Sequence, residues 1–483
     1  MSKFAELRRQ YHSFIYKDYH IERTPEGLRL RYDFEIPALA EFHPAWFFPV
    51  PADRPVDLSS PVLRELVFSL GMAESISYWK CACPEQLRVE CGELSSGQQR
   101  WWRKLYYNGL GEFMYRNGIV CGETELVQFE SAGSAENAGC GVSSGGNCAP
   151  GAGGGEKDGD AAGAGALPLH DPASYTGYLV PVGGGKDSVV SLELLRGEDL
   201  MTYCIDGTAG TASIREVTAL CAHSRGNYAA RRILDRRLID LNQQGFLNGH
   251  TPFSAIVAFS SVMAAFLTGR KYIALSNETS ANETTVPGSF VNHQYSKSFE
   301  FEQDFDRYFA GITDSDIHYF SLLRPLTEIQ IASLFAGHDR YHMAFRSCNV
   351  GSKQGIWCGS CAKCLFVYII LSPFLPEDRL IRIFGEKLLD RPSLDRDFRE
   401  LSGIDENKPF ECVGTRSEVM AALKSYVERG GRSFLTERYR GRILASPDSL
   451  AQLLSGWAAE NNVPEELQEK IRASLKEAAR GEG

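Results

Sequence analysis

The sequence predicts an α/β protein built on a parallel sheet with helices on both faces. Two observations carry this prediction: strand and helix patterns alternate along residues 177–276, and a glycine turn joins the first of these strands to a helix. An α+β unit rich in Trp and Tyr is expected before this region, and a charged helical extension is expected after it.

Each expected element has its own pattern. Strict alternation of apolar and polar residues in "GLRLRYDFEI" predicts a strand, and two aromatic-rich stretches that follow it read as helices. Strands are expected at 27–36, 177–182, 201–206 and 271–276, and helices at 75–87, 100–118, 187–197, 254–269, 417–430 and 465–480.

Residues 131–167 consist mainly of Gly, Ala and Ser, which cannot bury enough apolar surface to offset the entropy of ordering. We therefore expect a flexible linker or insert there. It separates an N-terminal α+β domain, residues 1–130, from a nucleotide-binding α/β domain, residues 168–404, and residues 405–483 form the C-terminal extension.

Composition limits the classes of function. The chain has 483 residues and a formal charge of −10, from 51 basic and 61 acidic residues, which argues against a broad nucleic-acid surface. The N-terminus has no apolar signal region, and the longest apolar runs are too short to cross a bilayer. Thirteen cysteines without a signal peptide are expected to be thiols or metal ligands. The prediction is a soluble, cytoplasmic protein without nucleic-acid or membrane partners.

The glycine turn lies in "YLVPVGGGKDSVVSLELL". A Walker A loop fails because Asp187 follows the Lys, and a dinucleotide fingerprint fails because Ser188 occupies its third Gly position. The PP-loop pattern of ATP pyrophosphatases, S-G-G-x-D-S, fits at Gly184, Gly185, Asp187 and Ser188. Gly183 replaces the leading Ser, and this removes one expected hydroxyl contact.

This turn has the features that a pyrophosphate site needs. Glycines let the backbone approach the phosphates, and the N-terminus of the next helix supplies N–H groups and positive dipole. Asp187 can hold a Mg²⁺ ion and Ser188 can donate a hydroxyl, while Lys186, directly before them, is expected in the same catalytic and ATP-binding site. A PP-loop cleaves ATP between its α- and β-phosphates. Asp206, which ends the next strand, is a candidate adenosine contact or a simple cap.

Four cysteines gather in "SCNVGSKQGIWCGSCAKC". The C-x₂-C-x₂-C spacing suits tetrahedral thiolate ligation, and one cysteine ten residues upstream can complete it. A structural zinc site is favoured over an iron–sulfur cluster or free thiols, because four ligands leave no open position for catalysis. The ligands would be Cys348, Cys358, Cys361 and Cys364.

A polar segment follows the strand at 271–276, at the edge where open α/β sheets bind ligands. Such a density of Asn, Glu and Ser exceeds what a turn requires, although a solvated loop is the alternative. Ser276 and Asn277 are expected in the nucleotide site. The candidates for acid and base catalysis are Glu278, Glu283, His293, Tyr295 and Lys297, chosen by their chemistry alone.

Several stretches together resemble the family of ATP-dependent UDP-N-acetyl-α-D-muramoyl-L-alanyl-L-glutamate epimerases, the MurL family. They are "VGGGKDSVVSLELL", "NGHTPFSAIVAF", "ALSNETSANE", "VNHQYSKSFEFE", "RPLTEIQIASLFA", the cysteine cluster and "KPFECVG". The resemblance covers residues 178–414 well and the N-terminal region more loosely.

The resemblance implies an isomerase of peptidoglycan precursor synthesis. Such an enzyme uses ATP to invert the terminal L-Glu of UDP-MurNAc-L-Ala-L-Glu to D-Glu through an acyl-adenylate, and releases AMP and diphosphate; the expected Mg²⁺ and structural Zn²⁺ follow from Asp187 and from the cysteine spacing. Adenylation would neutralise the α-carboxylate and so make the neighbouring α-proton acidic enough to remove.

Two other functions remain open on the sequence alone. One is an adenylating PP-loop ligase, such as a 7-cyano-7-deazaguanine synthase, which would consume ammonia without exchanging a proton at carbon. The other is a tRNA-modifying enzyme, which the acidic charge balance disfavours.

Overall fold

The computed structural model describes residues 2–52, 55–131, 175–206, 211–282, 292, 294–312, 316–351, 354–406, 408–409 and 411–480. The predicted linker lies outside these residues, except for Ser131 at its start. Within the described part of the chain, no helix combines the length and apolar character that crossing a membrane requires.

The strands of the described residues form one eleven-stranded sheet, ordered β11-β10-β7-β8-β9-β4-β2-β1-β5-β6, with β3 paired to β2. Their bounds are β1 Ser13–Thr24, β2 Gly27–Ile36, β3 Ala40–Phe42, β4 Ala45–Pro49, β5 Gln86–Val89, β6 Gln128–Ser131, β7 Thr176–Pro181, β8 Leu200–Asp206, β9 Asn227–Ile233, β10 Arg270–Leu275 and β11 His318–Ser321.

The sheet changes character at one junction. Strands β11, β10, β7, β8 and β9 are parallel to one another, so their carboxyl ends lie at one edge. β4 pairs antiparallel with β9 and continues into the antiparallel strands β2 and β1. The predicted α/β class is confirmed, and the sequence did not reveal that the N-terminal strands extend the same sheet. The PP-loop assignment and the domain boundaries stay predictions.

The helices precede, connect and follow the strands. They are α1 Lys3–Gln10, α2 Pro61–Trp79, α3 Ser96–Gly109, α4 Gly111–Arg116, α5 Glu123–Leu126, α6 Lys186–Leu194, α7 Thr211–Leu220, α8 Arg236–Gln243, α9 Phe253–Thr268, α10 Phe299–Ala310, α11 Glu328–Ala336, α12 Ala362–Leu371, α13 Glu377–Phe384, α14 Asp395–Ser402, α15 Arg416–Glu428, α16 Phe434–Arg438, α17 Arg440–Ala445, α18 Leu450–Ser455 and α19 Glu465–Arg480.

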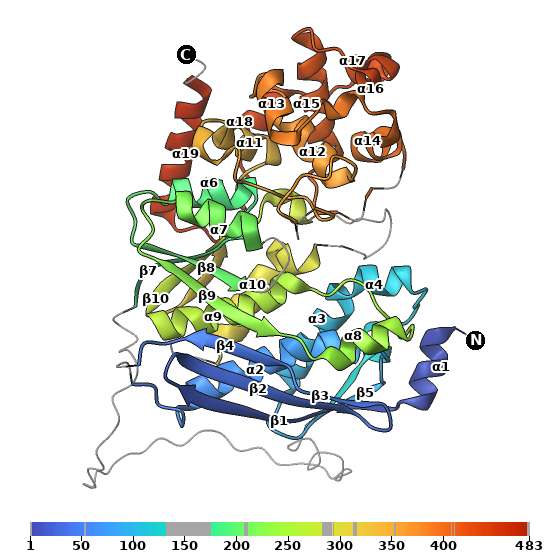
Figure 1. Ribbon diagram of the computed structural model, residues 1–483, viewed down its shortest axis with the longest axis vertical. Helices are drawn as coiled ribbons and strands as arrows, with labels where there is room; N and C mark the ends of the chain where they lie inside the picture. Colours follow the sequence, from blue (N-terminus) through green and yellow to red (C-terminus); the bar gives the residue numbers. More distant parts are fainter. Residues whose placement is uncertain are drawn as a thin grey trace, which may run out of the picture.

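The two halves of the sheet enclose a pair of helices. α2 packs on β1 and β2, α9 packs on β7 to β10, and the two helices contact each other (Figure 1). Both are apolar around most of their circumference, as expected of helices buried between two sheet faces. Aromatic rings from α3 and α10 complete this core, with Trp102 and Phe259 stacked at a centroid distance of 5.1 Å.

A second core covers the opposite face of the parallel strands. α6 and α7 lie on that face, and α11, α12, α15 and α19 pack outward from them (Figure 1). The charged C-terminal helices expected from the sequence at 417–430 and 465–480 are present as α15 and α19. Each buries its apolar side in this core, so the C-terminal helices pack on the α/β core.

The predicted helix at 75–87 is partly wrong. α2 ends at Trp79, and residues 86–89 form β5. Pro84 cannot continue a helix, and Cys83 has a φ of 50°, a left-handed conformation that ends the helical path. The aromatic content of this stretch indicated burial but not the type of element.

Candidate functional site

The glycine turn connects β7 to α6 at the carboxyl edge of the parallel strands. Gly184 has a φ of +78°, and a Cβ atom there would lie 2.5 Å from Ser213 Oγ, so only glycine fits. Gly183 N donates a 3.0 Å hydrogen bond to Ser188 Oγ. Gly185 is the N-cap of α6 and offers no side-chain acceptor to the first-turn N–H groups. The turn therefore has the geometry of an anion-binding helix N-terminus.

A buried ionic cluster begins directly after this turn. The Lys186 ammonium is 1% exposed and contacts both Asp187 Oδ1 and Glu328 Oε2. Glu328 stands at the start of α11, where its own N–H donates a 2.6 Å hydrogen bond to Glu418 Oε1. Lys186 and Asp187 of α6, Glu328 of α11 and Glu418 of α15 thus connect three helices next to the glycine turn. These contacts fix the start of α6.

The charges of this cluster depend on one another. Burial opposes the charge of Lys186, but Asp187 and Glu328 outweigh it and raise its pKa. Burial likewise opposes the charge of Asp187, but Lys186 and then Lys363 lower its pKa, so Asp187 is ionised. Burial is the largest cause acting on Glu328 and raises its pKa, while the charge of Lys186 acts in the opposite direction. Of the two carboxylates that contact Lys186, Asp187 is the one that solvent reaches, with 27% of its side chain exposed.

The segment after β10 reaches the same edge. Asn277 Nδ2 donates a 3.0 Å hydrogen bond to Ser321 Oγ at the end of β11, and Ser276 Oγ accepts from Ser191 Oγ of α6 at 2.8 Å. Arg324 is fully buried and ties the region together. Its guanidinium donates to the backbone oxygens of Glu278, at 2.7 Å, and Lys297, at 2.6 Å.

Lys297 forms a pair with a cysteine from the C-terminal region. Its Nζ lies 3.4 Å from Cys412 Sγ, and the Lys363 ammonium donates to the Cys412 backbone oxygen. The negative charge of Cys412 is the largest cause that raises the pKa of Lys297, and Glu278 and Asp187 add to it against burial. Both residues are only partly buried, so solvent reaches them. The pair therefore places a nucleophilic sulfur beside a cation at an accessible position.

The structure places the predicted residues unevenly. Lys186, Asp187, Ser188, Glu278 and Lys297 come together at one edge of the sheet, as expected of residues that follow neighbouring parallel strands.

Asp206 ends β8 with a partly exposed side chain that lies 3.2 Å from Arg215. Tyr295 is buried beside Asn108, and burial raises its pKa. Glu283 and His293 lie outside the described residues. The roles of all these residues stay predictions.

Five residues of the candidate site were not predicted from the sequence. Three are single charged residues that read as ordinary caps or surface charges, and the others are the lone Cys412 and a lysine inside the cysteine motif. The signal that could have found four of them is their place in stretches that carry the family resemblance: "RPLTEIQIASLFA", the cysteine cluster and "KPFECVG". The five are Arg324, Glu328, Lys363, Cys412 and Glu418.

The four predicted metal ligands converge. The Sγ atoms of Cys348, Cys358, Cys361 and Cys364 all lie within 4.8 Å of one another. Pairs of 3.5 Å and 3.8 Å occur among them, near the roughly 3.8 Å that tetrahedral ligation at 2.3 Å requires. The backbone N–H groups of Gly351 and Cys358 donate to Cys348 Sγ, at 3.0 and 3.4 Å, which stabilises a thiolate. The cluster can therefore hold a metal ion.

The loop that leads into the cysteine cluster also contacts the glycine turn. Arg346 N, two residues before the first ligand, donates a 2.8 Å hydrogen bond to Gly184 O. Ser347 Oγ would lie 2.6 Å from a Cβ atom on Gly185. A metal bound by the cysteines would fix the loop that packs against the turn.

Replacing Cys361 with serine should remove the bound metal and lower the free energy of unfolding by about 3 kcal/mol or more, since metal affinity is folding energy at such a site. Elemental analysis and urea unfolding measure the two effects. Cys221→Ser changes a buried cysteine outside the cluster and should keep the metal. Purified wild-type protein with neither zinc nor iron would contradict this prediction.

Comparison with known proteins gives consistent matches. A family model described as the MurL N-terminal domain matches residues 5–322, and one described as the MurL C-terminal domain matches residues 344–436. Three relatives each carry the name UDP-N-acetyl-alpha-D-muramoyl-L-alanyl-L-glutamate epimerase. The protein of Xanthomonas oryzae pv. oryzae is 34% identical over 432 residues, 86% of this chain and 88% of its own length. That of Micromonospora sp. is 35% identical over 392 residues, 79% of each chain, and that of Salinispora tropica is 34% identical over 401 residues, 79% of this chain and 78% of its own.

Proposed function

Since the chain belongs to the MurL family of epimerases, as its motifs indicated, we propose that it inverts the terminal L-Glu of UDP-MurNAc-L-Ala-L-Glu to D-Glu with consumption of ATP. The observation that carries the proposal is the meeting of two kinds of group at one edge of the sheet. An anion-binding turn with the ionised Asp187 lies beside the Lys297–Cys412 pair.

The first half of the reaction is adenylation. An oxygen of the substrate α-carboxylate attacks the α-phosphorus of ATP, and the bond to the pyrophosphate breaks. The N–H groups of the glycine turn and the N-terminus of α6 bind the pyrophosphate. Asp187 would hold Mg²⁺, which neutralises phosphate charge when bound. The product is an acyl-adenylate, in which the α-carboxylate no longer carries a negative charge.

The second half is inversion at carbon. The Cys412 thiolate takes the α-proton and becomes a thiol, and the electron pair of the C–H bond is left as an enolate. Lys297 holds the sulfur as a thiolate, because a cation 3.4 Å away favours the charged form. A proton then returns on the opposite face, and the acid–base candidates that remain by their chemistry are Glu278, Glu283, His293 and Tyr295. Water hydrolyses the adenylate to AMP and the free carboxylate.

Incubation with ATP, Mg²⁺ and UDP-MurNAc-L-Ala-L-Glu in D₂O tests the proposed function. The expected products are AMP, pyrophosphate and a D-Glu peptide with one deuterium at the α-carbon, measured by mass spectrometry after chiral separation. The matched control omits ATP and should show neither inversion nor exchange. AMP release together with a product that has incorporated ammonia but no deuterium would instead support an adenylating ligase.

A further inference from the structure

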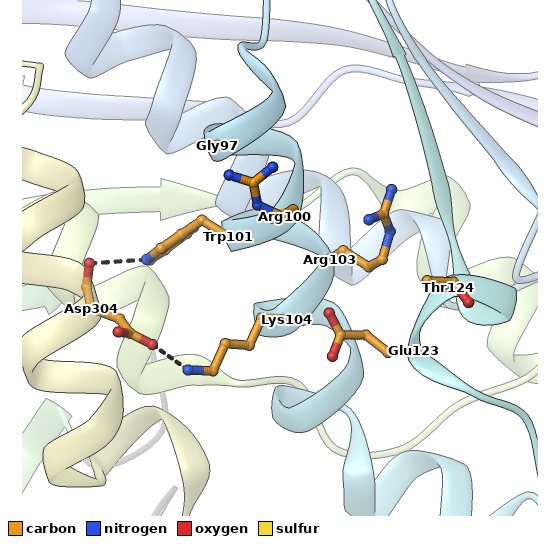
Figure 2. Close-up of a pocket in the computed structure, with 8 residues that line it drawn as sticks. All are labelled: Gly97, Arg100, Trp101, Arg103, Lys104, Glu123, Thr124 and Asp304. Carbon is orange, nitrogen blue, oxygen red and sulfur yellow. Dashed lines mark hydrogen bonds and ion pairs between the residues drawn. The ribbon is translucent and has the colours of Figure 1, made fainter.

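A cavity of about 570 Å³ opens between α3, α5 and α10, outside the cluster described above. One helix contributes all of its basic lining residues, since Arg100, Arg103 and Lys104 all come from α3 (Figure 2). The other lining residues are Gly97, Trp101, Glu123, Thr124 and Asp304.

The three cations of the cavity differ in their partners. Lys104 is neutralised by Glu300, at 2.6 Å, and Asp304, at 2.5 Å. Arg103 Nε donates to the Val127 backbone oxygen at 3.3 Å. Within the described ranges, no carboxylate forms an ion pair with Arg103 or Arg100. Two guanidinium groups, one turn apart on α3, thus keep donors available for a ligand.

The chemistry of this pair favours a diphosphate. Arginine presents several N–H donors in a planar fork that matches phosphate oxygens, and two forks one helical turn apart can bind adjacent phosphates. The Trp101 ring forms a rigid wall, because its Nε1 donates to the Asp304 backbone oxygen at 3.0 Å and its face stacks on Tyr308. Glu123 lines the same cavity and adds a negative charge on the side of α5, so the phosphates would bind away from it.

Helix α3 links the cavity to the proposed reaction site. Tyr295, two residues before Lys297, lies beside Asn108 of α3. Asn108 follows Arg100 by eight residues on the same helix, a separation of about 12 Å. A muramoyl group and a dipeptide, which join a diphosphate to a terminal glutamate, span a distance of this order.

We propose that Arg100 and Arg103 bind the diphosphate of the nucleotide-linked substrate, while its terminal glutamate reaches Lys297 and Cys412. The inference rests on the proposed function for the identity of the whole substrate, but the diphosphate site itself can be tested without turnover. UDP is the probe for this purpose.

The test is isothermal titration calorimetry of the full chain with UDP. Arg100→Gln with Arg103→Gln should weaken UDP binding at least tenfold, because both charge-assisted guanidinium–phosphate contacts are lost. The matched control is Arg382→Gln with Arg396→Gln, two exposed arginines of the C-terminal helices, each paired one turn away on its own helix. It should bind UDP like the wild type. Circular dichroism checks that both double variants are folded.

Steady-state kinetics separate the two proposals. The arginine variant should show a KM for the UDP-linked substrate raised at least tenfold, with an unchanged KM for ATP. Wild-type protein that does not bind UDP, or a variant that binds it within twofold of wild type, overturns the inference and leaves the epimerase to be decided by deuterium exchange. Arginine-dependent UDP binding without epimerisation supports the diphosphate site and refutes the proposed function.

Discussion

Asp187→Asn should lower the rate of AMP and pyrophosphate release by about 10³-fold, because an amide cannot provide the charge that holds Mg²⁺ at the phosphates. The change removes the one carboxylate of the Lys186 cluster that is partly exposed to solvent. The measurement is the release of AMP from ATP in the presence of the dipeptide substrate. Inversion should fall by the same factor, since it follows adenylation.

The matched control for this substitution is Asp240→Asn, which removes an exposed carboxylate on α8, a helix that contributes no side chain to the Lys186 cluster. It should retain wild-type rates. Unfolding measurements on both variants exclude a loss of structure. AMP release by Asp187→Asn within tenfold of the wild type would refute the assigned role of this carboxylate.

Cys412→Ser should separate the two halves of the reaction. Deuterium incorporation at the α-carbon should fall by about 10²- to 10⁴-fold, the usual contribution of a positioned general base, because a hydroxyl is a far weaker base at neutral pH. AMP release should continue, since the glycine turn and Asp187 are unchanged. The measurement follows both products in one D₂O reaction, and the serine hydroxyl still offers Lys297 an acceptor.

Cys121→Ser, a change at another partly buried cysteine, is the control and should leave both products unaffected. A Cys412→Ser enzyme that exchanges deuterium at the wild-type rate would show that another group removes the proton. Equal losses of AMP and deuterium would point to a structural role for Cys412 between Lys297 and Lys363.

The sequence predicted those parts of the site that depend on local pattern. Gly184 and Asp187 lie in a turn between a strand and a helix, and the spacing of the four cysteines was enough to predict that their Sγ atoms meet. Glu328 and Cys412 could not be placed in this way, because each reaches the site through the packing of α11 on α6 and of α15 on α11. A single charge at a helix start has the same local pattern whether it caps that helix or faces a distant lysine.

The fold shows the same division. Hydrophobic alternation located β2, and a short apolar run before the glycine turn located β7. Pairing between β4 and β9, however, joins segments about 180 residues apart in the chain, and no local pattern records it. The helix predicted at 75–87, which overlaps the start of β5, was partly wrong for a related reason. Its aromatic residues report burial, which helices and strands share, so only the Pro84 turn marked the change of element.

The continuous sheet also determines which strand edges a second molecule could reach. A sheet that is not closed exposes unpaired N–H and C=O groups along its outermost strands, where a second molecule can add a strand of its own. β4 covers the side of β9 that would otherwise be such a template. Along the ordered path of the described strands, the two ends are β11 and β6, each only four residues long. Short ends give an incoming strand few hydrogen bonds, so the shared sheet leaves little edge for aggregation to start from.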